Sequence, residues 1–307
     1  MMIMETKSLT ALVSAFSRAY HAEHNPVKIF DDRIARLLLT DEEYGGISAN
    51  MSQAIAFFKP GFSGTREQAL RQVVDHQLSP TPLGRAAFAE QALASAAALG
   101  ARQYLIFAAG YDTFAYRQPE WASQLDIFEI DHPVTAADKQ ARLSGLDMDP
   151  PPNLHFISAD LREPDWRRHV LASPGFNPER VSFCSLLGIS YYLAKEDFRQ
   201  LLSGIASLLP AGSGIVFDYP DEQTFTPQAG ERAQKQLMMA ARAGEPMQAA
   251  YSRSELERML EGLGWRIDRH LEPEEVTLQL FQAYNDSQPE HPIAAFDHVN
   301  YCLAVKR

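Results

Sequence analysis

Three patterns in the middle of the sequence combine residue types that can bind a nucleoside. The apolar run Gln103–Ala108 leads into a turn at Gly110, where a backbone without Cβ lets a ligand approach closely. Twenty-one residues later a second run ends at Asp131, and a carboxylate offers paired acceptors to the two hydroxyls of a ribose. A third run precedes Asp160 and Leu161, an acid and an apolar side chain that suit the amino group and ring of adenine.

Each pattern alone is weak, because a glycine after a strand is often only a turn and an acid there often caps the next helix. Their occurrence in order after successive strand-like runs indicates a nucleoside-containing cofactor. A dinucleotide needs small residues at three positions of a Gly-x-Gly-x-x-Gly turn, so that pyrophosphate can lie at the helix start. Here the turn contains the bulky Tyr111, the anionic Asp112 and Thr113. These residues favour S-adenosylmethionine, which carries a sulfonium and no phosphate, over NAD.

The elements that position these residues alternate along the chain. From about residue 100 onward, short β-type runs alternate with helical patterns, which is typical of an α/β fold with a mostly parallel sheet covered on both faces. The predicted strands are Gln103–Ala108, Asp126–Ile130, Leu154–Ser158, Val181–Leu186, Gly214–Asp218, Trp265–His270 and Val299–Val305. Ligands of such sheets bind at the carboxyl ends of the strands, where the turn and both acids fall.

Two helical patterns are predicted to pack on this sheet. Arg85–Leu99 is rich in alanine and is followed by Gly100, a common helix terminator. Lys195–Leu209 places its large apolar residues on one face and is followed by proline and glycine. A further helix is predicted to begin after Ser252, because Ser-x-x-Glu is a capping-box pattern.

Two segments do not follow this alternation. Helical patterns at Thr10–Tyr20 and Asp31–Leu39 predict a helical N-terminal cap over residues 1–84. The remaining residues, 85–307, are predicted to form the ligand-binding domain. Within it, residues 221–250 form a nonrepetitive insertion after the fifth strand, and we interpret this insertion as a lid.

The composition disfavours several classes of function. With 28 Lys and Arg against 39 Asp and Glu, the net charge is −11 and no basic run is present, which disfavours nucleic acid as a partner. No window approaches the ~20 apolar residues of a membrane span. Cys184 and Cys302 lie inside predicted strands, which favours buried thiols in the cytoplasm over a disulfide. The nine histidines lack metal-ligand spacing, so no metal site is expected.

Longer motifs extend these patterns. They are Phe107-Ala-Ala-Gly-Tyr-Asp-Thr-Phe-Ala-Tyr-Arg117, Glu129-Ile-Asp-His-Pro133, Asp160-Leu161 and Gly188-Ile-Ser-Tyr-Tyr-Leu193. Together they resemble the leucine carboxyl methyltransferase family, which includes polyketide O-methyltransferases, over about residues 80 to 220. The resemblance implies a class I, Rossmann-like methyltransferase fold with seven strands and S-adenosylmethionine as cofactor.

The resemblance also implies roles for matching residues. Gly110 would line the methionine end of the cofactor, and Asp131 would hold its ribose. Asp160 and Leu161 would frame the adenine. Arg85 would pair with the cofactor carboxylate.

Four more residues complete the predicted site. Tyr192 matches a family tyrosine near the transferred methyl group and is the predicted catalytic residue. His132 is placed among the cofactor-binding residues, although a structural role before the next helix is favoured over a role as base. Ala108 replaces a family glycine, which we expect to be a mild change, and Leu187 replaces a family acid, which puts one cofactor contact in doubt.

We therefore predict an S-adenosylmethionine-dependent O-methyltransferase of a small, largely hydrophobic acceptor, such as a polyketide-like acid or phenol. Methyl transfer is an in-line displacement, so catalysis can rest on alignment and on excluding water. The expected acceptor walls are Phe57, Phe58, Phe62, Tyr192 and Met238–Met239. The alternatives are a carboxyl methyltransferase of a protein C-terminus, a noncatalytic cofactor-binding protein and a nicotinamide oxidoreductase.

Overall fold

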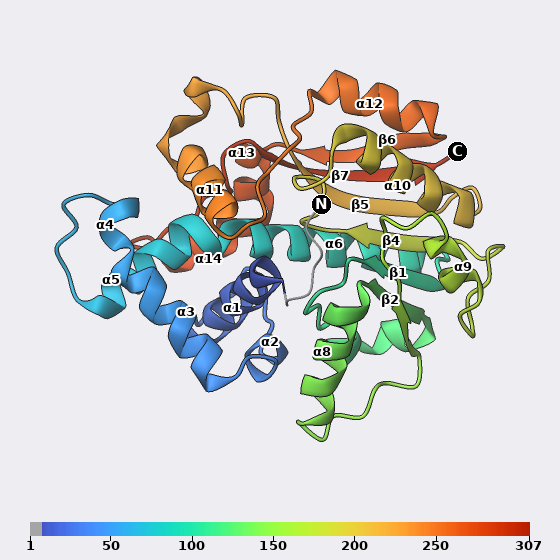
Figure 1. Ribbon diagram of the computed structural model, residues 1–307, viewed down its shortest axis with the longest axis horizontal. Helices are drawn as coiled ribbons and strands as arrows, with labels where there is room; N and C mark the ends of the chain where they lie inside the picture. The colour runs from blue at the N-terminus through green and yellow to red at the C-terminus, as the bar shows by residue number, and fades with distance from the viewer. Residues whose placement is uncertain (1–7) are drawn as a thin grey trace.

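A seven-stranded sheet forms the centre of the molecule in the computed structural model, which describes residues 8–307 (Figure 1). The strands are β1 (Gln103–Phe107), β2 (Asp126–Asp131), β3 (Leu154–Ser158), β4 (Ser182–Leu186), β5 (Gly214–Pro220), β6 (Trp265–Leu271) and β7 (Val299–Lys306). Their order is β3-β2-β1-β4-β5-β7-β6, with β1 to β5 parallel and β7 antiparallel to both of its neighbours. All seven predicted strands are confirmed, with ends shifted by two residues at most.

Helices cover both faces of this sheet. Successive residues of β1 point to opposite faces, so that Tyr104 and Ile106 pack with α6 while Leu105 and Phe107 pack with α10 and α12. The central strands β1, β4 and β5 are buried along their whole length. This two-sided burial explains why these strands are continuous apolar runs rather than alternating ones.

The helical elements are numerous and mostly short. They are α1 (Leu9–His24), α2 (Ile34–Leu37), α3 (Asp41–Gln53), α4 (Ile55–Phe58), α5 (Arg66–Val73), η1 (Val74–Leu78), α6 (Pro80–Ala98), α7 (Phe114–Arg117), η2 (Glu120–Gln124), α8 (Pro133–Ser144), α9 (Trp166–Leu171), α10 (Lys195–Leu208), η3 (Pro227–Ala229), α11 (Gly230–Arg242), α12 (Arg253–Gly262), α13 (Pro273–Val276), η4 (Thr277–Phe281) and α14 (Gln282–Ser287). Across residues 8–307, none of them combines the length and apolar character needed to cross a bilayer.

Helices α1 to α5 gather at one end of the molecule around a separate apolar core (Figure 1). The predicted helix Asp31–Leu39 is shorter than expected, because Asp32 is buried and its carboxylate accepts from the backbone N–H of Ala35 at 3.0 Å. The same carboxylate pairs with Arg18 at 2.8 Å and Arg117 at 3.2 Å. This ion cluster joins the cap to the loop after β1.

Two other boundaries differ from the prediction. Helix α6 begins at Pro80, five residues before the predicted start, because proline is tolerated in the first turn of a helix. The insertion at 221–250 contains η3 and α11, and its ends meet where Asp221 and Tyr251 form a β-bridge. The division into a cap of residues 1–84 and a domain of residues 85–307 stays a prediction.

His21 of α1 gives the fold a pH dependence. Its side chain is 1% exposed, and its Nε2 accepts from the backbone N–H of Ile29 at 2.9 Å. Burial lowers the pKa of His21 from 6.5 to about 4. The unfolded chain therefore binds a proton that the folded chain excludes, and between pH 7 and pH 5 this group should lower the free energy of unfolding by about 2 kcal/mol.

The variant His21→Gln keeps an acceptor for Ile29 but cannot titrate. We expect urea unfolding of this variant to lose less stability than the wild type between pH 7 and pH 5. All other titrating groups are the same in both proteins, so the difference between their two pH profiles of stability is the contribution of His21. Parallel pH profiles would contradict this assignment.

Candidate functional site

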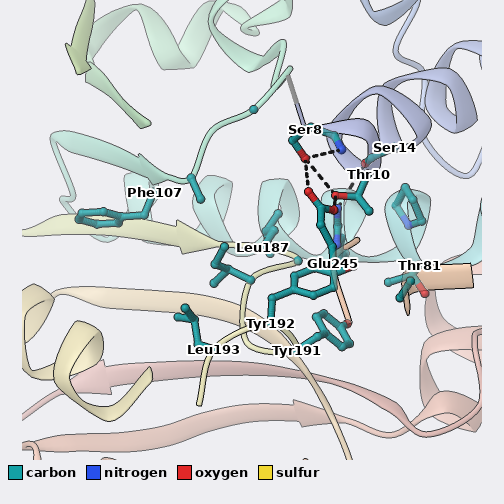
Figure 2. Close-up of a pocket in the computed structure, with 18 of the residues that line it drawn as sticks. Ser8, Thr10, Ser14, Thr81, Phe107, Leu187, Tyr191, Tyr192, Leu193 and Glu245 are labelled. Atoms are coloured by element: carbon teal, nitrogen blue, oxygen red, sulfur yellow. Dashed lines mark hydrogen bonds between the residues drawn. The ribbon is translucent and has the colours of Figure 1, made fainter. Parts of the chain in front are cut away.

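A cavity of about 1540 Å³ lies at the carboxyl ends of the parallel strands, between the sheet, α1, α6 and the lid (Figure 2). Pockets for one small ligand usually measure about 300–1,000 Å³, so this cavity has room for a cofactor and an acceptor together. It brings together all the predicted site residues, Arg85, Ala108, Gly110, Asp131, His132, Asp160, Leu161, Leu187 and Tyr192. Their individual roles stay predictions.

Asp131, at the end of β2, fixes the turn after β1 by hydrogen bonding to its backbone. The Asp131 carboxylate accepts from the backbone N–H of Gly110 at 2.5 Å and from that of His132 at 2.7 Å. Burial raises the pKa of Asp131, and these two N–H groups act against that rise. A carboxylate has about four acceptor positions, so Asp131 can hold the turn and still bind ribose hydroxyls.

Ala108 lies in a left-handed conformation, with φ of 52° beside 53° at Gly110. This conformation places a Cβ close to the carbonyl oxygen and costs about 1–2 kcal/mol for a residue other than glycine. The expectation that Ala108 is a mild change for cofactor binding stays a prediction. The chain accepts backbone strain at the turn that faces the cavity.

The acid after β3 is fixed by its neighbours. The Asp160 carboxylate accepts from the Arg162 guanidinium at 2.6 and 2.9 Å, which lowers the pKa of Asp160 and keeps it ionised. His132 precedes α8 and its Nδ1 accepts from the backbone N–H of Val134 at 3.3 Å, which fits a structural role. Its Nε2 lies 3.8 Å from Asp160. An ionised acid beside Leu161 remains suited to an adenine ring and its amino group.

Arg85 enters the cavity from α6 and is held at two points. Its Nη2 donates to Ser14 of α1 at 3.2 Å, and its Nη1 lies 3.4 Å from the carboxylate of Asp218 on β5. Sequence reasoning missed Asp218, although a charge inside the apolar strand Gly214–Pro220 was a usable signal. The cationic end of Arg85 therefore lies in the cavity with its charge balanced from the sheet side.

The loop after β4 carries both tyrosines of the Gly188 motif. It is a turn rather than an extended segment, so the two side chains do not alternate between faces, and both Tyr191 and Tyr192 line the cavity. The Tyr191 hydroxyl donates to Asp218. Burial raises the pKa of Tyr192 to about 12, so its hydroxyl keeps its proton at neutral pH. Leu187 contributes an apolar surface beside them.

The lid contacts the start of the first helix beside the cavity. The Glu245 carboxylate accepts from the hydroxyl of Ser8 at 3.2 Å and from that of Thr10, and Figure 2 shows this cluster above Tyr192. Sequence reasoning missed this contact, because 237 residues separate Ser8 from Glu245 and no local pattern links them.

The expected acceptor walls are only partly correct. Phe57, Phe58 and Phe62 do not line the cavity. Phe57 and Phe58 pack edge to face against each other, and Phe57 lies under cationic side chains of α11. Met239 lines the cavity, whereas Met238 is 46% exposed and points away from it. The aromatic cluster therefore joins the cap to the lid helix.

The chemistry of the lining residues fits S-adenosylmethionine. One acid lies at the end of β2, another acid lies beside an apolar side chain, and the partly exposed guanidinium of Arg85 is able to pair with an amino-acid carboxylate. Among residues 8–307, no group of three or more His, Cys, Asp or Glu side chains is arranged to hold a metal ion.

Comparisons with known proteins agree with this geometry. A family model for leucine carboxyl methyltransferase matches residues 11–206. YktD of Bacillus subtilis (strain 168), named as an S-adenosyl-L-methionine-dependent methyltransferase, is 40% identical over 305 residues and covers 98% of both chains.

Two solved structures share the fold. A DUF574 family protein from Streptomyces avermitilis MA-4680 has a TM-score of 0.59 at 16% identity, over 98% of each chain. A protein from Thermobifida fusca YX, described as a methyltransferase, has a TM-score of 0.52 at 16% identity, over 98% of this chain and 96% of that chain. The alternative of a nicotinamide oxidoreductase is not supported. The chain belongs to the leucine carboxyl methyltransferase family, and it is an S-adenosylmethionine-dependent methyltransferase.

Proposed function

We propose that the enzyme transfers the methyl group to an oxygen of a small, largely apolar acceptor, such as a hydrophobic carboxylic acid or phenol. The apolar part of the cavity wall supports this proposal most directly. Met239 and Met247 of the lid and Phe296 before β7 line the cavity, and Glu245 of the lid contacts Ser8 at the start of α1. An apolar wall inside a cavity favours a small apolar molecule over the charged surface of a folded protein.

Bound S-adenosylmethionine supplies an electrophilic methyl group. Arg85, Asp131, Asp160 and Leu161 are proposed to bind and orient it, and the lid excludes water. In residues 8–307 the Tyr192 hydroxyl has no hydrogen-bond partner, so it is available to donate to the acceptor oxygen. A carboxylate acceptor is already ionised at neutral pH and needs no general base.

The substrate class can be tested by following the formation of S-adenosylhomocysteine. Purified enzyme would be incubated with S-adenosylmethionine and a panel of small aromatic and aliphatic acids and phenols, in parallel with folded proteins that have a free C-terminal carboxylate. We expect turnover with members of the small-molecule panel. Methylation of protein C-termini alone would overturn the proposal in favour of the protein-tail alternative.

Tyr192→Phe tests the proposed role of the hydroxyl. The ring is kept and only the polar group is lost, so we expect kcat to fall by about tenfold or more while affinity for S-adenosylmethionine stays level. Steady-state kinetics and calorimetry measure the two quantities separately. Tyr116→Phe, which changes another half-buried tyrosine outside the cavity lining, is the matched control. An unchanged kcat in Tyr192→Phe would show that the hydroxyl has no role in the reaction and that Tyr192 only packs in the cavity wall.

A further inference from the structure

Three groups, two from the loop after β4 and one from α6, converge on the carboxylate of Asp218. Its side chain is 0% exposed, although it lies near the carboxyl end of β5 beside the cavity. The backbone N–H of Gly188 donates to Oδ1 at 2.7 Å, the Tyr191 hydroxyl donates to Oδ2, and Arg85 Nη1 lies 3.4 Å from Oδ2. The carbonyl oxygen of Asp218 also accepts from the Ser190 hydroxyl at 2.6 Å. One buried acid therefore fixes α6 and the loop after β4.

The guanidinium of Arg85 lies directly on the backbone of Gly188. A Cβ at position 188 would come within 2.2 Å of Nη1, and φ of 71° at Gly188 also disfavours any other residue. Burial disfavours the charged guanidinium, but the negative charge of Asp218, together with the nearby Tyr191, Tyr192 and Tyr301, outweighs burial and raises the pKa of Arg85. The cation is thus held at one place above the Gly188 turn, with its side chain still 19% exposed.

We propose that Asp218 is a positioning residue for the amino-acid part of S-adenosylmethionine. It holds the Arg85 guanidinium over the Gly188 turn, so that the donors not used by Asp218 and Ser14 are available for the cofactor carboxylate. An arginine offers five N–H donors, which allows both interactions at once. The family acid expected next to Gly188 is replaced by Leu187, but the carboxylate of Asp218 lies beside Gly188 from another strand. This inference rests on the proposed binding role of Arg85.

The variant Asp218→Asn keeps the shape of the side chain and an acceptor for Gly188 but removes the charge. Two probes separate positioning from general structure: S-adenosylhomocysteine, and 5′-methylthioadenosine, which lacks the amino-acid part. We expect the affinity for S-adenosylhomocysteine to fall about tenfold or more, while the affinity for 5′-methylthioadenosine stays within about twofold. Asp126→Asn, at the opposite end of the sheet, is the matched control and should change neither affinity.

Equal losses for both probes, or no loss for either, would overturn the positioning role. The variant Arg85→Leu shows whether the positioning role of Asp218 or the cofactor-binding role of Arg85 is wrong. If Arg85→Leu removes the preference for S-adenosylhomocysteine and Asp218→Asn does not, only the inference about Asp218 fails. If Arg85→Leu leaves the preference intact, the binding role of Arg85 itself is wrong and the inference falls with it.

Gly188→Ala provides a second variant in case Asp218→Asn does not fold. The added Cβ would displace the guanidinium from Asp218 without removing either charge. We expect the same selective loss of affinity for S-adenosylhomocysteine. An unchanged preference between the two probes in this variant would overturn the inference.

Discussion

Replacing Arg85 with leucine should abolish tight binding of S-adenosylmethionine and lower the free energy of unfolding by about 3–5 kcal/mol, because a buried ion pair loses one partner. The cofactor would lose a guanidinium able to grip its carboxylate. The remaining acid, Asp218, would stay buried without a cation. The burial of Asp218 makes a substantial loss of stability the expected result.

Urea unfolding at pH 7 and calorimetry with S-adenosylhomocysteine measure the two effects. Arg85→Lys is the control, because it keeps the charge beside Asp218 but loses the planar fork. It should recover most of the stability and little of the affinity. A leucine variant as stable as the wild type would show that the pair with Asp218 contributes nothing to the fold.

Replacing Asp131 with alanine is expected to weaken cofactor binding by at least about 1–3 kcal/mol, since a ribose loses a charge-assisted partner in a partly buried site. The loss should be at the upper end of this range, because the same carboxylate holds the Gly110 turn. Calorimetry with S-adenosylhomocysteine measures the change, and circular dichroism checks the fold. Asp149→Ala, at an exposed loop position, is the matched control. Unchanged affinity in a folded Asp131→Ala variant would remove Asp131 from the site.

Much of the fold could be predicted because strands buried on both faces must be apolar runs, and these runs stand out between polar loops. The residues of the proposed cofactor-binding part of the site could be predicted for a related reason. Gly110, Asp131 and Asp160 each lie at or just beyond the carboxyl end of a strand, and parallel strands end at one edge of the sheet. Their meeting in one cavity thus depends on topology more than on detailed packing.

The acceptor half could not be predicted because its contacts are distant in sequence and have no local pattern. Glu245 meets Ser8 and Thr10 only once the lid lies over α1. Phe57 and Phe58 are as apolar as a substrate wall, but their contacts with α11 decide where they point. Periodicity reports which residues are buried and says nothing about which other element buries them.

The place of β7 in the sheet has a consequence for how the enzyme is made. Strand β6 is joined to the sheet only through β7, which lies between it and β5. During synthesis, β6 therefore has no strand to pair with, and one edge of β5 stays open, until residues 299–306 have left the ribosome. Contacts of such long sequence separation form late. We infer that the nascent chain can assemble its cofactor half first and completes the sheet beneath the lid last.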